Sequence, residues 1–452
     1  MKILLIQPPS QDDFMDQVFL FEPLSLEYLA AGMLEEGHEP VILDARIDRD
    51  IDSMVKDFRP DAVGITSFTS QVNITKKTAA DIRKIMPDTK IFIGGHHATV
   101  KPEDFNETYI DAVVIGEGVF TLKELMKAVT EKKDFSHIDG VGIPHPEKMI
   151  LTKPRPYTPL DELPFPARYL TKQHRNRYFS EWFKPLASLR TSLGCTARCN
   201  FCSLWSITGG KYLTRGHDSV IRELKSIEEK NVFFCDDESM CSAKRMDELA
   251  DRIREAGIRK NYFLYARADT IVRHPELFRK WAQIGLKQVF VGMEDFSDER
   301  LKSMKKNITT SQQEEAVKIL RDNNIMMYAS FMVSQDYTPA DFKALKAYIR
   351  RLKLTYATFT IMTPLPGTEL YHDNRHRMLS EKPELFDMLH TLLPTKMPMK
   401  DFYHELAELY KSAVPAYRLL PVIFRFSFFG FVQRLKLLGK FLNKLENAHL
   451  DY

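Results

Sequence analysis

The stretch Gly194-Cys195-Thr196-Ala197-Arg198-Cys199-Asn200-Phe201-Cys202-Ser203-Leu204-Trp205 is the most informative part of this chain. It holds three of the five cysteines, spaced C-x3-C-x2-C, so that three thiolates can converge on one inorganic centre. A cubane iron–sulfur cluster normally takes four cysteines, so three from one loop leave one iron open to a ligand that is not protein. We therefore predict a [4Fe–4S] cluster held by Cys195, Cys199 and Cys202.

The competing interpretation of this loop is a zinc knot. Structural zinc sites are closed by four ligands, commonly in C-x2-C pairs, and only Cys235 or Cys241 could complete such a set. Cys235 ends the apolar run 232–235, which favours a buried core thiol, and we assign no role to Cys241. The triplet on a single loop favours the cluster.

The sequence around the cysteine loop alternates between strand and helix patterns. A strand expected at 187–192 precedes the loop, and further strands are expected at 232–235, 262–266, 288–293, 326–333 and 357–362. Helices are expected between them at 219–230, 243–256, 275–284, 310–323 and 340–352. Six parallel strands in this order predict an incomplete (βα)6 barrel of the TIM type. Barrel chemistry takes place at the carboxyl ends of strands, and the cysteine loop follows the first strand.

The first 143 residues show a different α/β pattern. Apolar runs at 3–6, 41–43, 62–65, 91–93 and 112–115 predict a five-stranded, doubly wound parallel sheet of the Rossmann-like type. Ligands of such sheets bind beyond the carboxyl ends of the strands. The residues at those ends are Gln7, Pro8, Thr66, Ser67, Phe68, Gly94, Gly95, His96, His97, Gly116, Glu117 and Gly118. No G-x-G-x-x-G follows the first strand, which argues against a dinucleotide.

Two features of these strand ends have simpler interpretations. His96 and His97 have no carboxylate cluster beside them in the sequence, so loop histidines hydrogen-bonded at the surface are favoured over metal ligands. Gly116-Glu117-Gly118 can serve as a strand-to-helix turn without any ligand, and both interpretations stay open.

Length and composition limit the protein class. A chain of 452 residues with 44% hydrophobic and 28% charged residues is expected to form several globular domains. We place a sheet domain at 1–143, a proline-rich linker at 144–186, the barrel at 187–395 and a helical region at 396–452. A net charge of +3 gives no case for nucleic-acid binding. The uneven cysteine count and the absence of a signal-peptide pattern or long apolar run predict a cytoplasmic protein without a membrane span.

The C-terminal region has an unusual composition. Residues 418–444 carry six basic residues, no acidic one, and Phe424, Phe426, Phe428, Phe429 and Phe431. This combination favours a helix lying on a membrane surface, although Pro421 and Gly430 interrupt it. The alternative is a helix that packs its phenylalanines against the core.

The cysteine loop resembles the C-x3-C-x2-C signature of the radical S-adenosylmethionine (SAM) enzymes, and the likeness extends over most of the chain. It implies that SAM chelates the open iron and is cleaved by an electron from the cluster to give a hydrogen-abstracting radical. It also implies SAM contacts for Phe201, Asp236, Asp237, Glu238, Arg267 and Glu294, which otherwise read as strand-end residues in solvated ion pairs. Residues 329–334 lack the glycine-rich run that the family often has on its fifth strand.

The turn at 363–368 and the N-terminal sheet resemble the cobalamin-binding class of this family. That class implies cobalamin as a third cofactor. The usual D-x-H-x-x-G signature is absent, and His137-Ile138-Asp139-Gly140 lies in the wrong place, so we expect no protein histidine on cobalt.

Within that class the chain is most similar to the hopanoid C-3 methylase group, through 21–27, 202–205, 386–387 and 393–395. The resemblance implies a cobalamin-dependent methyltransferase acting on an unactivated carbon of a lipid, at or near the inner face of the membrane. It also implies a flavodoxin- or ferredoxin-type electron donor. The alternatives are a tetrapyrrole methylase, a cyclase or oxidase of the same class, and a cofactor sensor without catalysis.

Overall fold

The structure is a computed structural model that describes residues 1–10, 13–180, 183–413 and 428–452. The chain forms two compact units. The first comprises Met1–Cys195 and Ser203–Cys235, and the second comprises Thr196–Cys202 and Asp236–Tyr452.

The first unit contains a seven-stranded sheet with the order β3-β1-β4-β5-β6-β7-β8. Its first five members pair in parallel and confirm the expected sheet, whereas β7 and β8 extend it in antiparallel fashion. The two added strands were not predicted, because segments of two or three residues carry no readable periodicity. The strands are β1 (Lys2–Gln7), β3 (Glu39–Asp44), β4 (Ala62–Thr66), β5 (Lys90–Gly94), β6 (Ala112–Val114), β7 (Val141–Ile143) and β8 (Ile150–Leu151).

Strand β1 shows why helices cover both faces of this sheet. Successive side chains of a strand point to opposite faces, so Ile3 and Leu5 join one buried cluster and Leu4 and Ile6 join another. The first cluster includes side chains of α2 (Leu24–Glu35) and α6 (Val119–Glu131). The second includes side chains of α3 (Ile51–Phe58) and α4 (Val72–Ile85). The doubly wound architecture is thereby confirmed.

The segment expected to be a linker contributes to the interior of the first unit. Its 3₁₀ helix η4 (Arg168–Arg177) carries two arginines that pair with buried carboxylates. Arg168 Nη2 lies 2.8 Å from Glu223 Oε1, and Arg175 donates to Glu22. A 3₁₀ helix without an apolar stripe gives no periodic signal, so the sequence did not reveal this network.

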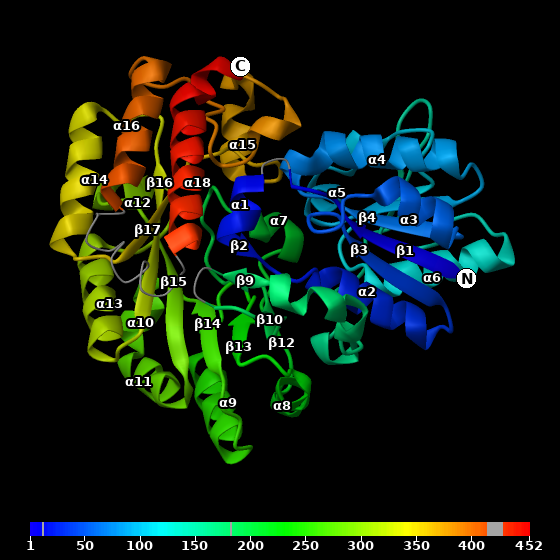
Figure 1. Cartoon of the computed structure of the whole chain (residues 1–452), viewed down its shortest axis with the longest axis horizontal. Helices are drawn as coiled ribbons and strands as arrows, with labels where there is room; N and C mark the ends of the chain where they lie inside the picture. Colours follow the sequence, from blue (N-terminus) through cyan, green and yellow to red (C-terminus); the bar gives the residue numbers. More distant parts are fainter. Residues whose placement is uncertain (11–12, 181–182, 414–427) are drawn as a thin grey trace. The chain divides into compact units, whose positions relative to one another are not determined.

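The strands expected for the barrel are all present. In the first unit β10 (Leu186–Leu189) pairs in parallel with β13 (Asn231–Phe234). In the second unit β14 (Asn261–Tyr265), β15 (Leu286–Glu294), β16 (Met326–Val333) and β17 (Tyr356–Ile361) form a parallel sheet with helices between successive strands (Figure 1). The helices between these strands are α10 (Ala268–Arg273), α11 (Pro275–Ile284), α12 (Asp298–Ser303), α13 (Thr310–Asp322) and α14 (Pro339–Arg351). Along the chain, α8 (His217–Ser226) precedes β13, α9 (Ala243–Glu255) precedes β14, and α15 (Glu369–Asn374) follows β17.

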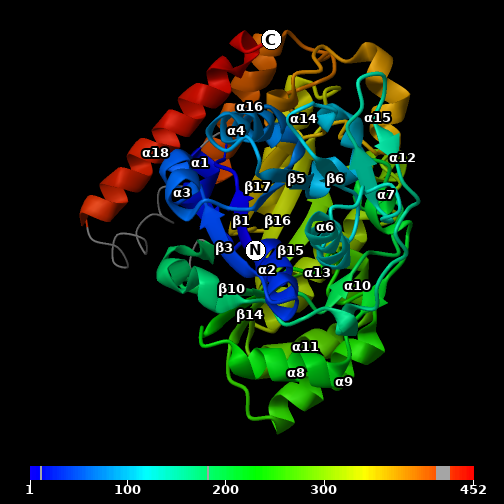
Figure 2. The same ribbon diagram turned by 90° about the vertical axis from the view of Figure 1, so that its right-hand side faces the viewer.

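The second unit ends in two helices that lie side by side, α16 (Met399–Ala413) and α18 (Phe428–Asn447) (Figures 1 and 2). The rings of Tyr410 and Phe441 meet edge to face at 5.0 Å, and Leu445 is also buried. The C-terminal end of α18 therefore packs against protein, as expected for a helix that packs on the core and not for one that lies on a membrane. The first part of the predicted basic and aromatic stretch, 418–427, which includes Phe424 and Phe426, lies outside the described residues. No helix in the described ranges has the length and apolar character to span a bilayer.

Candidate active site

The cysteine loop begins at a position that only glycine can occupy. Gly194 follows β11 (Ser192–Leu193), which pairs antiparallel with β12 (Leu213–Thr214). Gly194 has φ +98°, and a Cβ there would lie 1.9 Å from the carbonyl oxygen of Lys211. The close approach of the two backbones therefore excludes any side chain and fixes where the loop starts.

The middle of the loop is held by Asn200. Its backbone N–H donates to Met304 O at 3.2 Å and its side-chain Nδ2 donates to Ser303 O at 3.0 Å. Its carbonyl oxygen accepts from the backbone N–H of Leu370 at 2.9 Å. Nothing local to Asn200 indicates this role, because it depends on loops that lie about one hundred residues or more away in the chain.

The donor set of the loop suits an iron–sulfur centre. Cys195, Cys199 and Cys202 are each half-buried, and they precede α7 (Leu204–Thr208). Across the described ranges, no three His, Cys, Asp or Glu side chains lie close enough together to hold a metal ion. A cluster of iron and sulfide is larger than one ion, and thiolates are its usual ligands. Assignment of the three cysteines to it remains a prediction.

Two cations lie beside Cys199 in the second unit. Arg267 Nη1 is 4.0 Å from Cys199 Sγ, and the same guanidinium donates to Lys306 O at 2.7 Å and to Asp269 Oδ1 at 2.9 Å. Lys306 is buried, and its Nζ lies 2.6 Å from Glu294 Oε1. Burial disfavours the ammonium form, but the Glu294 carboxylate and the Cys199 sulfur outweigh it and raise the pKa of Lys306. Both side chains therefore carry positive charge toward the loop.

The backbone at the end of β15 aims Glu294 at Lys306. Glu294 has φ +61°, and the pairing of β15 with β16 shifts register between Gly292 and Glu294. A Cβ at position 292 would lie 2.2 Å from Glu294 Oε1 and 2.9 Å from Lys306 Nζ. The absence of a side chain at Gly292 therefore provides the space for the buried ion pair between Glu294 and Lys306.

The acidic residues after β13 differ in their surroundings. Asp236 and Glu238 are buried, whereas Asp237 is exposed. Burial raises the pKa of Glu238 to about 7, and Glu238 Oε1 lies 3.4 Å from the backbone N–H of Arg267.

The structure thus connects some of the predicted SAM residues and not others. Glu238 and Glu294 are linked to Cys199 through Arg267 and Lys306, and Phe201 is half-buried on the cysteine loop. Lys306 was missed because it follows another lysine and resembles a surface residue. Contact of these residues with SAM remains a prediction.

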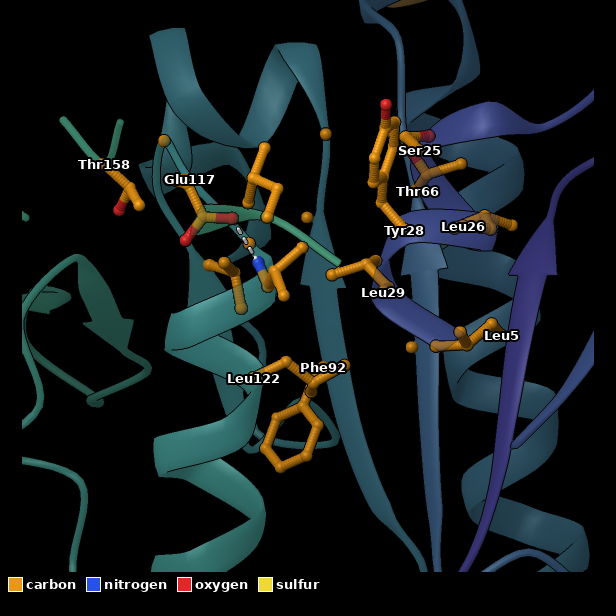
Figure 3. Close-up of a pocket in the computed structure, with 18 of the residues that line it drawn as sticks. Leu5, Ser25, Leu26, Tyr28, Leu29, Thr66, Phe92, Glu117, Leu122 and Thr158 are labelled. Atoms are coloured by element: carbon orange, nitrogen blue, oxygen red, sulfur yellow. Dashed lines mark hydrogen bonds between the residues drawn. The ribbon is translucent and has the colours of Figure 1, made fainter. Parts of the chain in front are cut away.

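A cavity of about 280 Å³ lies in the first unit at the carboxyl ends of its sheet strands. Six of the twelve predicted strand-end residues line it: Thr66, Gly94, Gly95, Gly116, Glu117 and Gly118. Most of the remaining lining is apolar, including Leu5, Leu26, Leu29, Phe92 and Leu122 (Figure 3). Ser25 and Tyr28 of α2 line it near Thr66, and Glu117 and Thr158 lie on the other side (Figure 3). Such an apolar cavity with few polar groups is typical of a small-molecule site.

Glu117 has a structural role in this cavity. Its carboxylate accepts hydrogen bonds from the backbone N–H groups of Val119 at 2.5 Å and Phe120 at 3.0 Å, at the start of α6. This pairing stabilises the helix N-terminus and fits the interpretation of 116–118 as a strand-to-helix turn.

The other six predicted residues, Gln7, Pro8, Ser67, Phe68, His96 and His97, are not part of the cavity lining. His97 is buried, with Nε2 2.9 Å from Asp104 Oδ2 and Nδ1 3.1 Å from Thr69 Oγ1. Burial lowers the pKa of His96, whose Nε2 lies 2.9 Å from Oγ of Ser203, the residue after Cys202. Both histidines are hydrogen-bonded, as expected, but they begin α5 (His96–Val100) instead of lying in a surface loop, and the burial of His97 was not predicted. Phe68 is 55% exposed.

Comparison with known proteins gives matches to both halves of the chain. Residues 18–126 match the B12 binding domain, and residues 189–349 match the Radical SAM superfamily. The chain is 28% identical to a hopanoid C-3 methylase of Methylococcus capsulatus, over 90% of this chain and 79% of that protein. It is 32% identical to an uncharacterized methyltransferase of Pyrococcus horikoshii, over 82% of each.

A solved structure shares the fold. It is that of the radical S-adenosylmethionine methyltransferase TsrM from Kitasatospora setae, with cobalamin and a [4Fe–4S] cluster bound. The TM-score is 0.72 at 18% identity, over 92% of this chain and 89% of that one. This likeness supports the predicted sheet and barrel architecture.

Proposed function

Because the chain belongs to the cobalamin-dependent radical SAM methyltransferases, we propose that it transfers a methyl group to an unactivated carbon of a hopanoid-type lipid. The observation that carries this substrate class is the similarity to a hopanoid C-3 methylase along 90% of the chain. The family brings a [4Fe–4S] cluster, SAM and cobalamin to the protein. When bound, the cluster supplies the electron that cleaves SAM, and cobalamin carries the methyl group.

The cysteine loop would hold the cluster through Cys195, Cys199 and Cys202. Thiolates are the ligand form, and neighbouring cations favour them over thiols. Arg267 and Lys306 supply positive charge near Cys199. The donor set and its electrostatic surroundings therefore fit the cluster.

Glu238 and Glu294 would meet the polar groups of SAM. Glu238 is a buried carboxyl with a pKa raised to about 7, so near neutral pH its charge depends on what lies against it. A cationic amine would favour the ionised form and gain a charge-assisted hydrogen bond. Glu294 is held in place by Lys306 and would accept hydrogen bonds from ribose hydroxyls through its carboxylate oxygens.

The first-unit cavity would receive part of the cobalamin. It is largely apolar, and its lining includes the backbone of five glycines, 64, 94, 95, 116 and 118, which lets a ligand approach closely. His97 is already paired with Asp104 and Thr69, so it is not offered as a ligand to cobalt. This would fit a cobalamin that takes no histidine ligand from the protein.

The remaining parts of the proposal concern organisation and partners. We place the cobalamin domain at 1–143, the linker at 144–186, the barrel at 187–395 and a helical region at 396–452. A lipid substrate gives the basic, aromatic stretch of 418–444 a purpose at the inner face of the membrane. A flavodoxin or ferredoxin would supply electrons.

The test is anaerobic reconstitution with iron, sulfide and cobalamin, followed by incubation with SAM, reductant and hopanoids. The proposal expects a hopanoid heavier by one CH2 group, with its new methyl derived from SAM, and no product from Cys199→Ala. A methylated tetrapyrrole with no methylated hopanoid would contradict the substrate class. Cleavage of SAM without methylation of any candidate would favour the cyclase or oxidase alternative.

A further inference from the structure

The backbone around Glu294 forms a tight turn at the end of β15. Glu294 has φ +61°, a conformation that residues other than glycine rarely adopt. The backbone N–H of Asp295 donates to the carbonyl oxygen of Met293 at 2.8 Å, so the chain makes a γ-turn with Glu294 at its centre. A γ-turn with a positive φ at its central residue is rare and strained. Such a conformation persists only when the surrounding structure holds it in place.

Gln313 of α13 supplies this support. Its side chain is fully buried, and its Nε2 donates to Met293 O at 2.6 Å and to Asp295 O at 3.1 Å. These two carbonyl groups belong to the residues on either side of Glu294. Oε1 of Gln313 accepts from the hydroxyl of Tyr348 in α14 at 2.7 Å. Because carbonyl oxygens only accept hydrogen bonds, the amide of Gln313 must present its nitrogen to the turn.

The carboxylate of Asp295 holds only one end of the same turn. Its Oδ2 accepts from the hydroxyl of Tyr337 at 2.6 Å, and its Oδ1 accepts from the backbone N–H of Ser297 at 2.8 Å. Both Asp295 and Tyr337 are fully buried. These hydrogen bonds fix residue 295, whereas the two from Gln313 reach both ends of the turn and therefore restrict the residue between them.

The position of the Glu294 carboxylate depends on this turn. A side chain takes its direction from the φ and ψ of its own residue, so a relaxed backbone at 294 would move the carboxylate. The ion pair with Lys306 balances the charge of Glu294 but makes no contact with the backbone of the turn. Hydrogen bonds between oxygen atoms need separations of about 2.5–3.0 Å, so a small rotation at residue 294 is enough to weaken those that its carboxylate accepts.

We propose that Gln313 is a positioning residue that aims the Glu294 carboxylate at the ribose hydroxyls of SAM. It acts by holding the carbonyl groups on both sides of Glu294, and it does not itself touch SAM. This inference rests on the proposed function, in which Glu294 accepts hydrogen bonds from the ribose.

The test measures how much the ribose hydroxyls contribute to SAM binding. SAM and an analogue whose ribose lacks both hydroxyl groups are titrated by calorimetry into the full-length, cluster-reconstituted protein. The titration is anaerobic and without reductant, so that SAM is not cleaved. The wild type is expected to bind the analogue about 10- to 100-fold more weakly than SAM, because hydrogen bonds to a carboxylate are lost.

Gln313→Met keeps the length of the side chain but removes both donors to the turn. Its Kd for SAM is expected to rise about 10-fold or more, and the ratio of the two Kd values is expected to fall below about 3. Tyr348→Phe removes only the hydroxyl that orients the amide, so its ratio should lie between those of the wild type and Gln313→Met. If Gln313→Met does not fold, as judged by thermal unfolding, Tyr348→Phe decides the test, because an unchanged ratio there would contradict the proposal.

The matched control is Gln312→Met. Gln312 is the preceding residue of α13, and its Oε1 accepts from the backbone N–H of Thr309 at 2.9 Å, where it caps the start of the helix. Its replacement removes a helix cap and leaves the turn at Glu294 untouched. The ratio of the two Kd values should therefore stay as in the wild type, even if the variant is less stable.

Three results would overturn the assignment. Equal weakening of SAM and the analogue in Gln313→Met, with an unchanged ratio, would leave Gln313 a purely structural role. A Glu294→Ala background in which Gln313→Met still lowers the affinity for SAM would show that Gln313 does not act through Glu294. A wild type that binds SAM and the analogue equally would show that Glu294 does not meet the ribose, and methyl transfer would stand. If the wild type binds no SAM at all, the proposed function fails together with this inference.

Discussion

Replacing Lys306 with methionine removes the charge that balances Glu294 in the second unit. Methionine keeps the length of the side chain, so the main loss is the ion pair of 2.6 Å between Lys306 Nζ and Glu294 Oε1. Both side chains are only 9% exposed, and the variant leaves a buried carboxylate without its cation. Removing one partner of a buried ion pair costs about 3–5 kcal/mol.

The double variant Lys306→Met/Glu294→Gln separates charge from packing. It removes both charges and retains similar side-chain volume, and replacing a buried pair by neutral groups is often close to neutral in stability. The φ of +61° at position 294 is the same in all variants, so backbone strain cancels in the comparison. The double variant should therefore be more stable than Lys306→Met alone.

Hydrogen–deuterium exchange measured on peptides of β15 reports the local stability of this region without interference from the first unit. A loss of about 3 kcal/mol predicts exchange more than 100-fold faster in Lys306→Met. Lys305→Met is the matched control, because Lys305 is 52% exposed and its surface pair with Glu369 is worth at most about 1 kcal/mol. Unchanged exchange in Lys306→Met, or a double variant less stable than the single one, would refute the reasoning.

Three further changes test other parts of the structure. Cys199→Ala should abolish the cluster absorption and all cleavage of SAM after anaerobic reconstitution; retained cleavage would contradict the ligand assignment. Gly292→Ala places a Cβ 2.2 Å from Glu294 Oε1, so it should displace that carboxylate and destabilise β15 by about 1–3 kcal/mol. It should also weaken the binding of SAM, measured by calorimetry. An unchanged affinity for SAM would show that Glu294 is not part of the SAM site. His390 lies 3.0 Å from both Asp387 and Asp451, and although burial opposes its charge, these carboxylates raise its pKa. Its stabilising effect should be complete below the usual pKa of 6.5 and lost as pH rises through the raised pKa, so the difference in Tm between wild type and His390→Gln should shrink with rising pH; a constant difference would exclude the titration.

The sequence predicted the strands of both sheets well because they are buried on two faces. Such strands appear in the sequence as continuous apolar runs. The run at 326–333 coincides with β16, and the run at 91–93 falls within β5. The cysteine loop was found for a different reason, since the spacing of its thiols is a property of the local sequence. Both signals are contained in a few neighbouring residues.

The parts that the sequence did not predict depend on contacts between distant residues. Glu22 and Arg175 pair across 153 positions, and nothing local to either residue indicates its partner. Lys305 and Lys306 are identical neighbours, yet Lys305 turns outward with φ +53° while Lys306 is buried against Glu294. Arg190 likewise followed a strand without any local sign that it would line a cavity.

The most direct measurement of the proposed chemistry is mass spectrometry of hopanoids after incubation with the anaerobically reconstituted protein, reductant and SAM that carries a deuterated methyl group. Methyl transfer to an unactivated carbon predicts a hopanoid that gains the intact deuterated methyl group in a reaction that requires added cobalamin. A hopanoid that stays unlabelled while SAM is cleaved, or labelling that proceeds equally without cobalamin, would contradict it.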